Sequence, residues 1–325
     1  MQAVTSEQFY RDLTSWDAAV ATTPDLDRFC SSSDWVVPAH EALMSGREMW
    51  SFYGSHGRVG MARGRHPDGW RYVEPLEAAW GLACPFVAQD PQAFGNELVA
   101  LFHEREDDWD VAVLSGLPMH SVFFTSLLQG LWRNFRVMRR PPTRRNIASL
   151  DGGLDGFLSR RTRNFRRSLA KSQRLADADG IVTEHHAGPG LDPDALYARV
   201  LAVEQRSWKG RDGVGICGGS MERFYQLMCR RLSARDALTV VFARHEDRDV
   251  GYVLGGLFDN TYRGLQVSFD ADYQRYSVGS LCQFAQITEL CASGVALYDL
   301  GTYMDYKLRW AETTMDSAVV LLTRQ

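Results

Sequence analysis

A short polar loop at residues 274–280 has side chains suited to binding an anion. It lies between an apolar, strand-like run that ends at Phe269 and a helix-like pattern. The first N–H groups of a helix lack partners and carry partial positive charge, so a glycine-containing loop can turn them toward a diphosphate. The loop matches neither the Walker A motif nor G-x-G-x-x-G, and the alternative is an ordinary capped turn. The candidate residues are Gln274, Arg275, Tyr276, Ser277, Val278, Gly279 and Ser280.

A candidate general base stands in the segment VEQRSWKG, residues 203–210. Glu204 ends a helix-like pattern and is followed by Trp208 and Lys209. Transfer of an acyl group to an amine requires the ammonium to lose a proton, and a carboxylate that burial makes more basic can accept it. The alternative is a structural ion pair of Glu204 with Arg206 or Lys209.

The segment YDLGTYMDYKLRW, residues 298–310, brings further reactive groups to the end of a predicted strand. A tyrosine hydroxyl there, from Tyr303 or Tyr306, can protonate a leaving thiolate. Lys307 can stabilise the oxyanion of a tetrahedral intermediate. The alternative is structural, with a Tyr–Asp hydrogen bond and a helix cap by Asp305. The polar candidates include Asp299 as well.

A basic helix is predicted over residues 155–178, with Leu158, Phe165 and Leu169 as its buried stripe. It is either a solvated face or a contact for a phosphorylated partner, such as the 3′-phosphate of coenzyme A, a nucleotide-linked substrate or a tRNA acceptor stem. No aromatic residues alternate with the cations, which argues against single-stranded RNA. The basic residues are Arg160, Arg161, Arg163, Arg166, Arg167, Lys171 and Arg174.

Two similar series of elements position these residues. Each half reads as a hairpin, a helix, a strand and a helix, which is a weak sign of duplication. The Pro pair in RRPPTRR, residues 139–145, is the predicted boundary, because proline breaks both helices and sheets.

The predicted elements before this boundary are a helix near Phe9–Val20, a hairpin at 49–64, a helix at 92–105, a strand at 109–118 and a helix at 119–135. After it we predict the basic helix, a helix at 192–207, a hairpin at 238–258, a strand at 261–269, a helix to Cys291, and strands at 295–301 and 317–324.

The order hairpin, strand, phosphate-type loop, helix, strand resembles the GNAT acyltransferase superfamily. Three stretches, residues 156–180, 203–213 and 298–313, make the chain similar to the double-GNAT, Fem-related branch that includes acetyltransferases associated with cellulose biosynthesis. The resemblance covers most of residues 35–315. It implies an α/β fold of the GNAT (α+β) type, with two tandem modules whose mixed, mostly antiparallel sheets are flanked by helices.

The resemblance implies a division of labour between the modules. Residues 1–145 lack the cofactor loop and form a scaffold for acceptor recognition, whereas residues 146–325 bind the acyl donor. The 274–280 loop holds the pyrophosphate of coenzyme A, and the backbone of Val267, Ser268 and Phe269 polarises the thioester carbonyl. The catalytic candidates are Glu204, Tyr303, Tyr306 and Lys307. The substrate-binding candidates are Trp208, Lys209, Asp299 and Asp305.

The expected reaction is transfer of an acyl group, acetyl first among the options, from acyl-CoA to a primary amine of a small molecule or peptide by direct attack. The loop has one glycine where GNAT loops have two or three, so two alternatives stay open. One is a Fem-type transfer from aminoacyl-tRNA, and the other is a non-catalytic GNAT scaffold that binds a nucleotide or a protein.

Composition restricts other functions. The net charge is −4, so any affinity for polyanions must be local. The six cysteines are scattered, without a C-x-x-C pair, and are expected to be reduced thiols. No signal peptide or membrane span is expected, and the protein is predicted to be cytoplasmic, as a monomer or homodimer. No metal is expected, because His185 and His186 lack a third ligand at suitable spacing, and a G-x-S-x-G elbow is absent.

Overall fold

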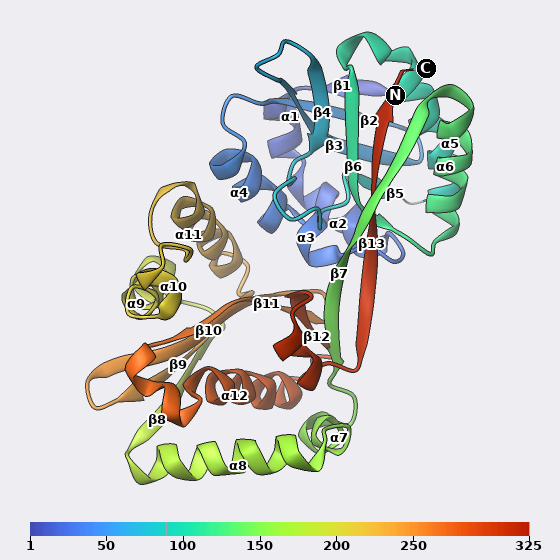
Figure 1. The fold of residues 1–325 in the computed structure, drawn as a ribbon. Coiled ribbons are helices and arrows are strands. Elements are labelled where there is room, and N and C mark those ends of the chain that lie inside the picture. Colours follow the sequence, from blue (N-terminus) through green and yellow to red (C-terminus); the bar gives the residue numbers. More distant parts are fainter. Residues whose placement is uncertain (89, 325) are drawn as a thin grey trace. The chain divides into compact units, whose positions relative to one another are not determined.

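The computed structural model describes residues 1–88 and 90–324. The chain divides into two compact units, unit 1 with residues 1–144 and 316–325, and unit 2 with residues 145–315. Each unit contains a mixed sheet with helices packed on it (Figure 1). The closing strand, which the sequence groups with residues 146–325, is thus part of unit 1.

Unit 1 has the strand order β1-β2-β3-β4-β6-β13-β7, and β5 pairs with β3. The pair β4–β6 is parallel, and β2–β3 forms the predicted antiparallel hairpin. The strands are β1 (Gln2–Val4), β2 (Glu48–Tyr53), β3 (Gly57–Arg65), β4 (Arg71–Pro75), β5 (Phe86–Ala88), β6 (Val111–Pro118), β7 (Arg136–Ser149) and β13 (Thr313–Thr323). The helices are α1 (Ser6–Arg11), α2 (Leu13–Thr22), α3 (Arg28–Ser31), α4 (Ser33–Leu43), α5 (Pro91–Glu104), the 3₁₀ turn η1 (Glu106–Asp108) and α6 (Val122–Asn134).

Unit 2 has the strand order β7-β12-β11-β10-β9-β8, beginning with the last residues of β7. Only β11–β12 is parallel among these pairs. The strands are β8 (Ile181–Ala187), β9 (Leu238–His245), β10 (Arg248–Phe258), β11 (Thr261–Phe269) and β12 (Leu297–Thr302). The helices are α7 (Gly153–Ser159), α8 (Arg163–Ala178), α9 (Pro193–Glu204), α10 (Trp208–Arg211), α11 (Gly219–Ser233), η2 (Ala271–Tyr276), α12 (Val278–Ala292) and η3 (Asp305–Arg309).

The core of unit 2 forms between α12 and the sheet. The helix buries Leu281, Ile287 and Leu290 against strand residues that include Val253 and Tyr298. Burying such side chains stabilises the unit by roughly 1.5–3 kcal/mol each. The predicted helix that ends near Cys291 is therefore confirmed, and its packing fixes the position of the helix N-terminus at the end of β11. The predicted fold class is confirmed as well.

Two expectations about the middle of the chain differ from the structure. Proline is expected to break the sheet within residues 139–145, but β7 runs through the Pro pair in an exposed stretch, where the fixed φ of proline suits an extended chain. The first segment of unit 1 ends at Arg144, inside the stretch predicted as the boundary. The basic helix predicted as one element consists of two helices, α7 and α8. Thr162 is the N-cap of α8, because its hydroxyl accepts the N–H of Phe165 at 3.2 Å. Helix α11 was not predicted.

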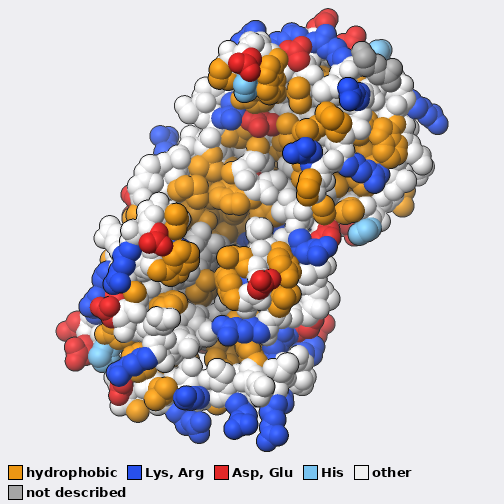
Figure 2. All heavy atoms as spheres, in the orientation of Figure 1, with side chains coloured by type: hydrophobic (Ala, Val, Ile, Leu, Met, Phe, Trp, Pro, Cys, Tyr) orange, Lys and Arg blue, Asp and Glu red, His pale blue; other side chains and the backbone are white. Residues whose placement is uncertain are grey.

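The arginines of the basic segment separate accordingly. Arg160 and Arg161 lie before α8, and Arg161 is buried rather than on an outer helix face. Arg163, Arg167, Lys171 and Arg174 are exposed, within an arc of about 80° opposite the buried side of α8. Figure 2 shows Lys and Arg side chains gathered along this helix. In the described residues none of these four has an ion pair.

The remaining structural expectations concern cysteines and membrane spans. All six cysteines are free; four are buried, and Cys217 and Cys291 are half-buried. Within residues 1–88 and 90–324, the helices are too short or too polar to cross a bilayer.

Candidate functional site

An open strand edge lies between the two parallel strands of unit 2. Pairing of β11 with β12 covers Thr261–Arg263 and Leu297–Asp299. Strand β11 continues for six residues to Phe269, and β12 ends at Thr302, but within the described chain the two strands do not pair with each other beyond Arg263 and Asp299. Beyond the paired residues, the backbone of β11 therefore has one neighbour, β10, and one free side.

The register shows which backbone groups face that free side. The N–H of Asp270 donates to the carbonyl of Val250 at 2.9 Å, and hydrogen-bonded pairs alternate in an antiparallel ladder. Ser268 therefore bonds to β10, whereas Val267 and Phe269 direct N–H and C=O to the open side. The ammonium of Lys209 donates to the Val267 carbonyl at 2.9 Å, which agrees with this orientation.

The end of β11 is fixed by a buried carboxylate. Asp270 accepts hydrogen bonds from the guanidinium groups of Arg206, at 2.9 Å, and Arg248. Its other oxygen accepts the N–H of Asp272 at 3.2 Å and starts η2. The strand, the turn and the following helix are thus held in a defined relation.

The N-terminus of α12 has free N–H groups. Ser277 is in the left-handed region at φ 54°, and its carbonyl accepts the N–H of Ser280 at 2.8 Å. Among described residues, the N–H groups of Val278 and Gly279 have no acceptor, and no side chain caps the helix. A Cβ on Gly279 would lie 3.2 Å from the Phe269 ring, so the helix start packs closely on the end of β11. These N–H groups can bind an anion.

The other loop residues differ in their surroundings. Gln274 and Ser277 are exposed. Arg275 forms an ion pair with Asp179 at 3.1 Å and stacks on the Tyr276 ring. The hydroxyl of Tyr276 donates to Asp179, which raises the pKa of this tyrosine. Both side chains are thereby tied to the end of α8.

Glu204 is fully buried at the end of α9. Its Oε2 accepts the hydroxyl of Tyr252 at 3.0 Å, and burial beside this carboxylate raises the pKa of Tyr252. In the described residues Oε1 has no hydrogen-bond partner, and a Cβ on Gly215 would lie 2.7 Å from it. The structural partners expected from sequence are engaged elsewhere, since Arg206 binds Asp270 and Lys209 binds β11.

Two lysines lie at the free backbone edges of β11 and β12. Lys209 bonds to the Val267 carbonyl, and Lys307 donates to the Thr302 carbonyl at 2.9 Å. Burial and then the charge of Arg263 lower the pKa of Lys307 to about 8, with a further contribution from Lys209. Burial also lowers the pKa of Lys209, and the Glu204 carboxylate opposes this shift.

A buried ion cluster holds the paired ends of these strands. Asp299 Oδ2 accepts the guanidinium of Arg263 at 2.7 Å and pairs with Arg145, and Oδ1 accepts the N–H of Gly301 at 2.7 Å. All three charged side chains are buried, so both oxygens of Asp299 are occupied inside the protein. The other substrate-binding and catalytic candidates, Trp208, Tyr303, Asp305 and Tyr306, are exposed.

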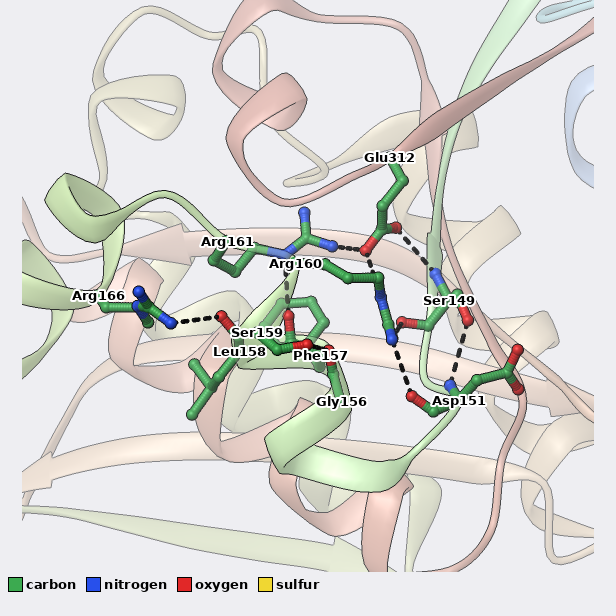
Figure 3. Close-up of polar contacts among 10 residues, drawn as sticks. All are labelled: Ser149, Asp151, Gly156, Phe157, Leu158, Ser159, Arg160, Arg161, Arg166 and Glu312. Atoms are coloured by element: carbon green, nitrogen blue, oxygen red, sulfur yellow. Dashed lines mark hydrogen bonds and ion pairs between the residues drawn. The ribbon is translucent and has the colours of Figure 1, made fainter.

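A second network anchors the segment that carries Lys307. Glu312 bonds to the N–H of Ser149 at 3.0 Å and to Arg160 at 3.2 Å, and it forms an ion pair with Arg161 (Figure 3). Burial lowers the pKa of Arg161 to about 10. Trp310, edge-on to Phe165 at 4.8 Å, is buried beside this network. The chain after η3 is thus fixed, whereas Tyr303 before η3 and Tyr306 within it are exposed.

The structure adds Tyr252 and Gln266 to the sequence-derived set. Tyr252 supports Glu204, and Gln266 accepts from Lys209 at 3.2 Å while donating to the hydroxyl of Tyr225 at 2.8 Å. In sequence both stand in strand patterns, and only tertiary packing reveals them: α9 packs on β10 at Tyr252, and Gln266 of β11 contacts Lys209 of α10 and Tyr225 of α11. Across the described residues, no cluster of three or more His, Cys, Asp or Glu side chains could hold a metal.

Comparison with known proteins finds a family model that matches this part of the chain. Residues 163–308 match the family model of the acetyltransferase (GNAT) domain. This match covers α8 through η3 and includes both edges of the open strand pair. No curated protein sequence matches the chain.

Solved structures share the fold at low identity. FemX is 12% identical, with a TM-score of 0.68 over 94% of this chain and 95% of that chain. The C-terminal domain of a lysylphosphatidylglycerol synthetase from Agrobacterium fabrum is 13% identical, with a TM-score of 0.58 over 96% and 92%. A tandem GNAT protein of the clavulanic acid pathway is 13% identical, with a TM-score of 0.50 over 99% and 97%. The tandem GNAT fold is therefore established.

Proposed function

We propose that the chain is an N-acyltransferase that moves an acyl group, acetyl first among the options, from acyl-CoA to a primary amine of a small molecule or peptide. The observation that carries the proposal is the free edge of β11 next to the uncapped start of α12. An extended chain with amide groups can pair along Val267–Phe269 while its diphosphate meets the N–H groups of Val278 and Gly279. Pantetheine with its pyrophosphate has this shape.

The proposed reaction is direct attack of the amine on the thioester. The N–H groups of Val267 and Phe269 polarise the carbonyl, and the ammonium of Lys307 stabilises the oxyanion. Glu204 accepts the ammonium proton of the acceptor through Oε1, while Tyr252 holds Oε2. Tyr303 or Tyr306 then protonates the leaving thiolate. Unit 1 serves as a scaffold for acceptor recognition.

Thermal unfolding with a panel of coenzyme A thioesters tests this proposal. We expect the matching thioester to raise the melting temperature of the wild-type chain. Ser277→Asp places a carboxylate at the helix start, where it can cap α12 and repel a diphosphate. Without a ligand, this variant should melt at the same temperature as the wild type. It should bind the thioester at least about 10-fold more weakly, which is a loss of about 1.4 kcal/mol of binding free energy.

Ser277→Asn is the matched control, because it caps the helix without a charge and tolerates the left-handed backbone. It should bind like the wild type. If Ser277→Asp binds as tightly as Ser277→Asn, the diphosphate does not lie at α12. If no thioester raises the melting temperature, an acyl-CoA donor is excluded.

A second candidate is transfer from aminoacyl-tRNA. The exposed cations of α8 favour it, since Arg163, Arg167, Lys171 and Arg174 have no anionic partners in the described chain. A polyanion would neutralise them with release of counterions. Tight tRNA binding at physiological salt, weakened in a variant with these four residues changed to Gln, together with no response to thioesters, would select this candidate. If neither a thioester nor tRNA binds and no turnover is detected, the remaining candidate is a non-catalytic scaffold.

A further inference from the structure

The chain has three lysines, Lys171, Lys209 and Lys307, among its 36 Lys and Arg residues. Two of the three lie at the open edge between β11 and β12. Lysine differs from arginine in that it can lose its proton near neutral pH when buried and then act as a nucleophile. The position of these two amines therefore has a chemical consequence beyond charge.

Two hydrogen bonds fix the side-chain amine of Lys209 at the open edge of β11. Its Nζ is fixed at 2.9 Å from the Val267 carbonyl and 3.2 Å from Gln266 Oε1, and Gln266 is itself held by Tyr225. Burial lowers the pKa of Lys209, which increases the share of neutral amine. Glu204, which acts electrostatically on Lys209, has a buried Oε1 without a donor in the described residues. The amine at the strand edge therefore has a buried carboxylate that acts on it electrostatically and has an unoccupied oxygen in the described residues.

Lys307 lacks this combination. Its Nζ bonds to the Thr302 carbonyl on β12, and the nearby charge of Arg263 acts on it. The carboxylate nearest in the ion cluster, Asp299, is already bound by Arg145 and Arg263. Among the described residues, the carboxylate that acts on Lys307 thus has both oxygens engaged by other groups.

We propose that Lys209 is a self-acylation site, at which the bound thioester transfers its acyl group to Nζ when no other amine is present. This proposal rests on the proposed function. The ε-ammonium gives one proton to Glu204, and the nitrogen lone pair attacks the thioester carbonyl carbon. The C–S bond breaks as the N–C bond forms, and the second proton leaves with the thiolate as free thiol. The product is an amide at Lys209, and no oxidant or other reactant is needed.

Two physical effects favour this transfer. A nucleophile held beside the donor can reach an effective concentration of about 10⁵–10⁸ M when the geometry is good. The product amide is neutral, so acylation removes one of two like charges at the strand edge. Lys307 then loses a neighbour that lowers its pKa, and the modified chain should hold the Lys307 proton more firmly.

Mass spectrometry of the full chain tests the proposal. The protein is incubated with acetyl-CoA and, separately, with the thioester that gives the largest thermal shift, without an added amine. We expect one acyl group per chain, located at Lys209 by peptide mapping, with exposed Lys171 unmodified as the internal reference for chemical acylation. Glu204→Gln should slow the modification about 100-fold, because the proton acceptor is lost.

Lys209→Arg is the matched variant, since it keeps the charge but is not acylated. It should carry no acyl group after the same incubation. A thioester that stabilises the wild type but leaves Lys209 unmodified overturns the self-acylation and leaves the proposed function intact. Equal modification of Lys171 and Lys209 also overturns it. If no thioester binds, the proposed function fails and this proposal fails with it.

Discussion

Units 1 and 2 contain the same local motif, a parallel strand pair beside a helix, but only unit 2 leaves it open. In unit 1, pairing of β4 with β6 covers Tyr72–Val73 and Val111–Ala112. Beyond it the chain itself packs on β6. The N–H of Gly116 donates to the Gly81 carbonyl at 3.2 Å, and a Cβ on Gly116 would lie 2.3 Å from the Ala83 backbone.

The helix starts differ in the same way. Asp90 caps α5 and accepts the N–H groups of Gln92 and Ala93, each at 3.1 Å. At α12 no side chain takes this role in the described residues. Unit 1 therefore satisfies its own backbone groups with a carboxylate and a loop, whereas the equivalent groups of unit 2 have no partner in the described residues. This difference supports the proposal that unit 2 binds the donor.

The largest expected difference concerns two buried glutamates. Glu204 has one oxygen without a donor in the described chain, whereas Glu77 of unit 1 accepts the N–H groups of Trp80, Leu82 and Ala83. Glu204→Gln should lower kcat by about 10²–10⁴-fold with little loss of stability. Glu77→Gln should cost about 1–3 kcal/mol of stability and leave kcat per folded molecule unchanged. Steady-state kinetics and thermal unfolding of both variants measure this, and equal losses of kcat would remove the distinction between the units.

The next effect belongs to Lys307, since unit 1 contains no lysine. Lys307→Ala should lower kcat by about 10²–10³-fold if the ammonium stabilises the oxyanion. The Lys307 ammonium is charged below its pKa of about 8 and loses its proton as the pH rises through that value. Arginine stays charged over this range. The ratio of wild-type to Lys307→Arg kcat should therefore fall above pH 8, and a ratio independent of pH would contradict the assigned role.

The smallest effect tests the closed motif of unit 1. Asp90→Ala removes the cap of α5 and should cost about 1 kcal/mol of stability. Because this helix start is not a ligand site in the proposed scheme, the thermal shift caused by a thioester should keep its size. A weaker thioester response in Asp90→Ala would mean that unit 1 takes part in donor binding.

The sequence predicts the order of elements better than it predicts their contacts. The hairpins β2–β3 and β9–β10 are predicted from turn residues between apolar runs, and α12 is predicted from the helix-like pattern that ends near Cys291. The partner of Glu204 could not be predicted, because Tyr252 lies 48 residues away on β10 and looks like any core tyrosine. The break between α7 and α8 could not be predicted, because in sequence Thr162 is one polar residue within a basic run. In the structure its side chain caps α8.

The partners of buried charged residues could not be predicted from the sequence either. Asp299 reads as a candidate for substrate contact, but the fold encloses it between Arg145 and Arg263. Arg161 reads as part of a surface face, whereas it pairs with Glu312 inside unit 2. A one-dimensional pattern indicates that a charge is present. Whether a distant partner neutralises it depends on tertiary packing.

The last strand gives the chain an order of assembly. Residues 145–315 form unit 2 without interruption, whereas unit 1 needs β13, whose Val320 and Leu322 are buried beside β6. As the ribosome adds residues from the N-terminus, unit 2 can fold as soon as its own segment has emerged. Unit 1 keeps an unpaired edge of β6 until β13 has been made, so the unit whose synthesis begins first is completed after unit 2.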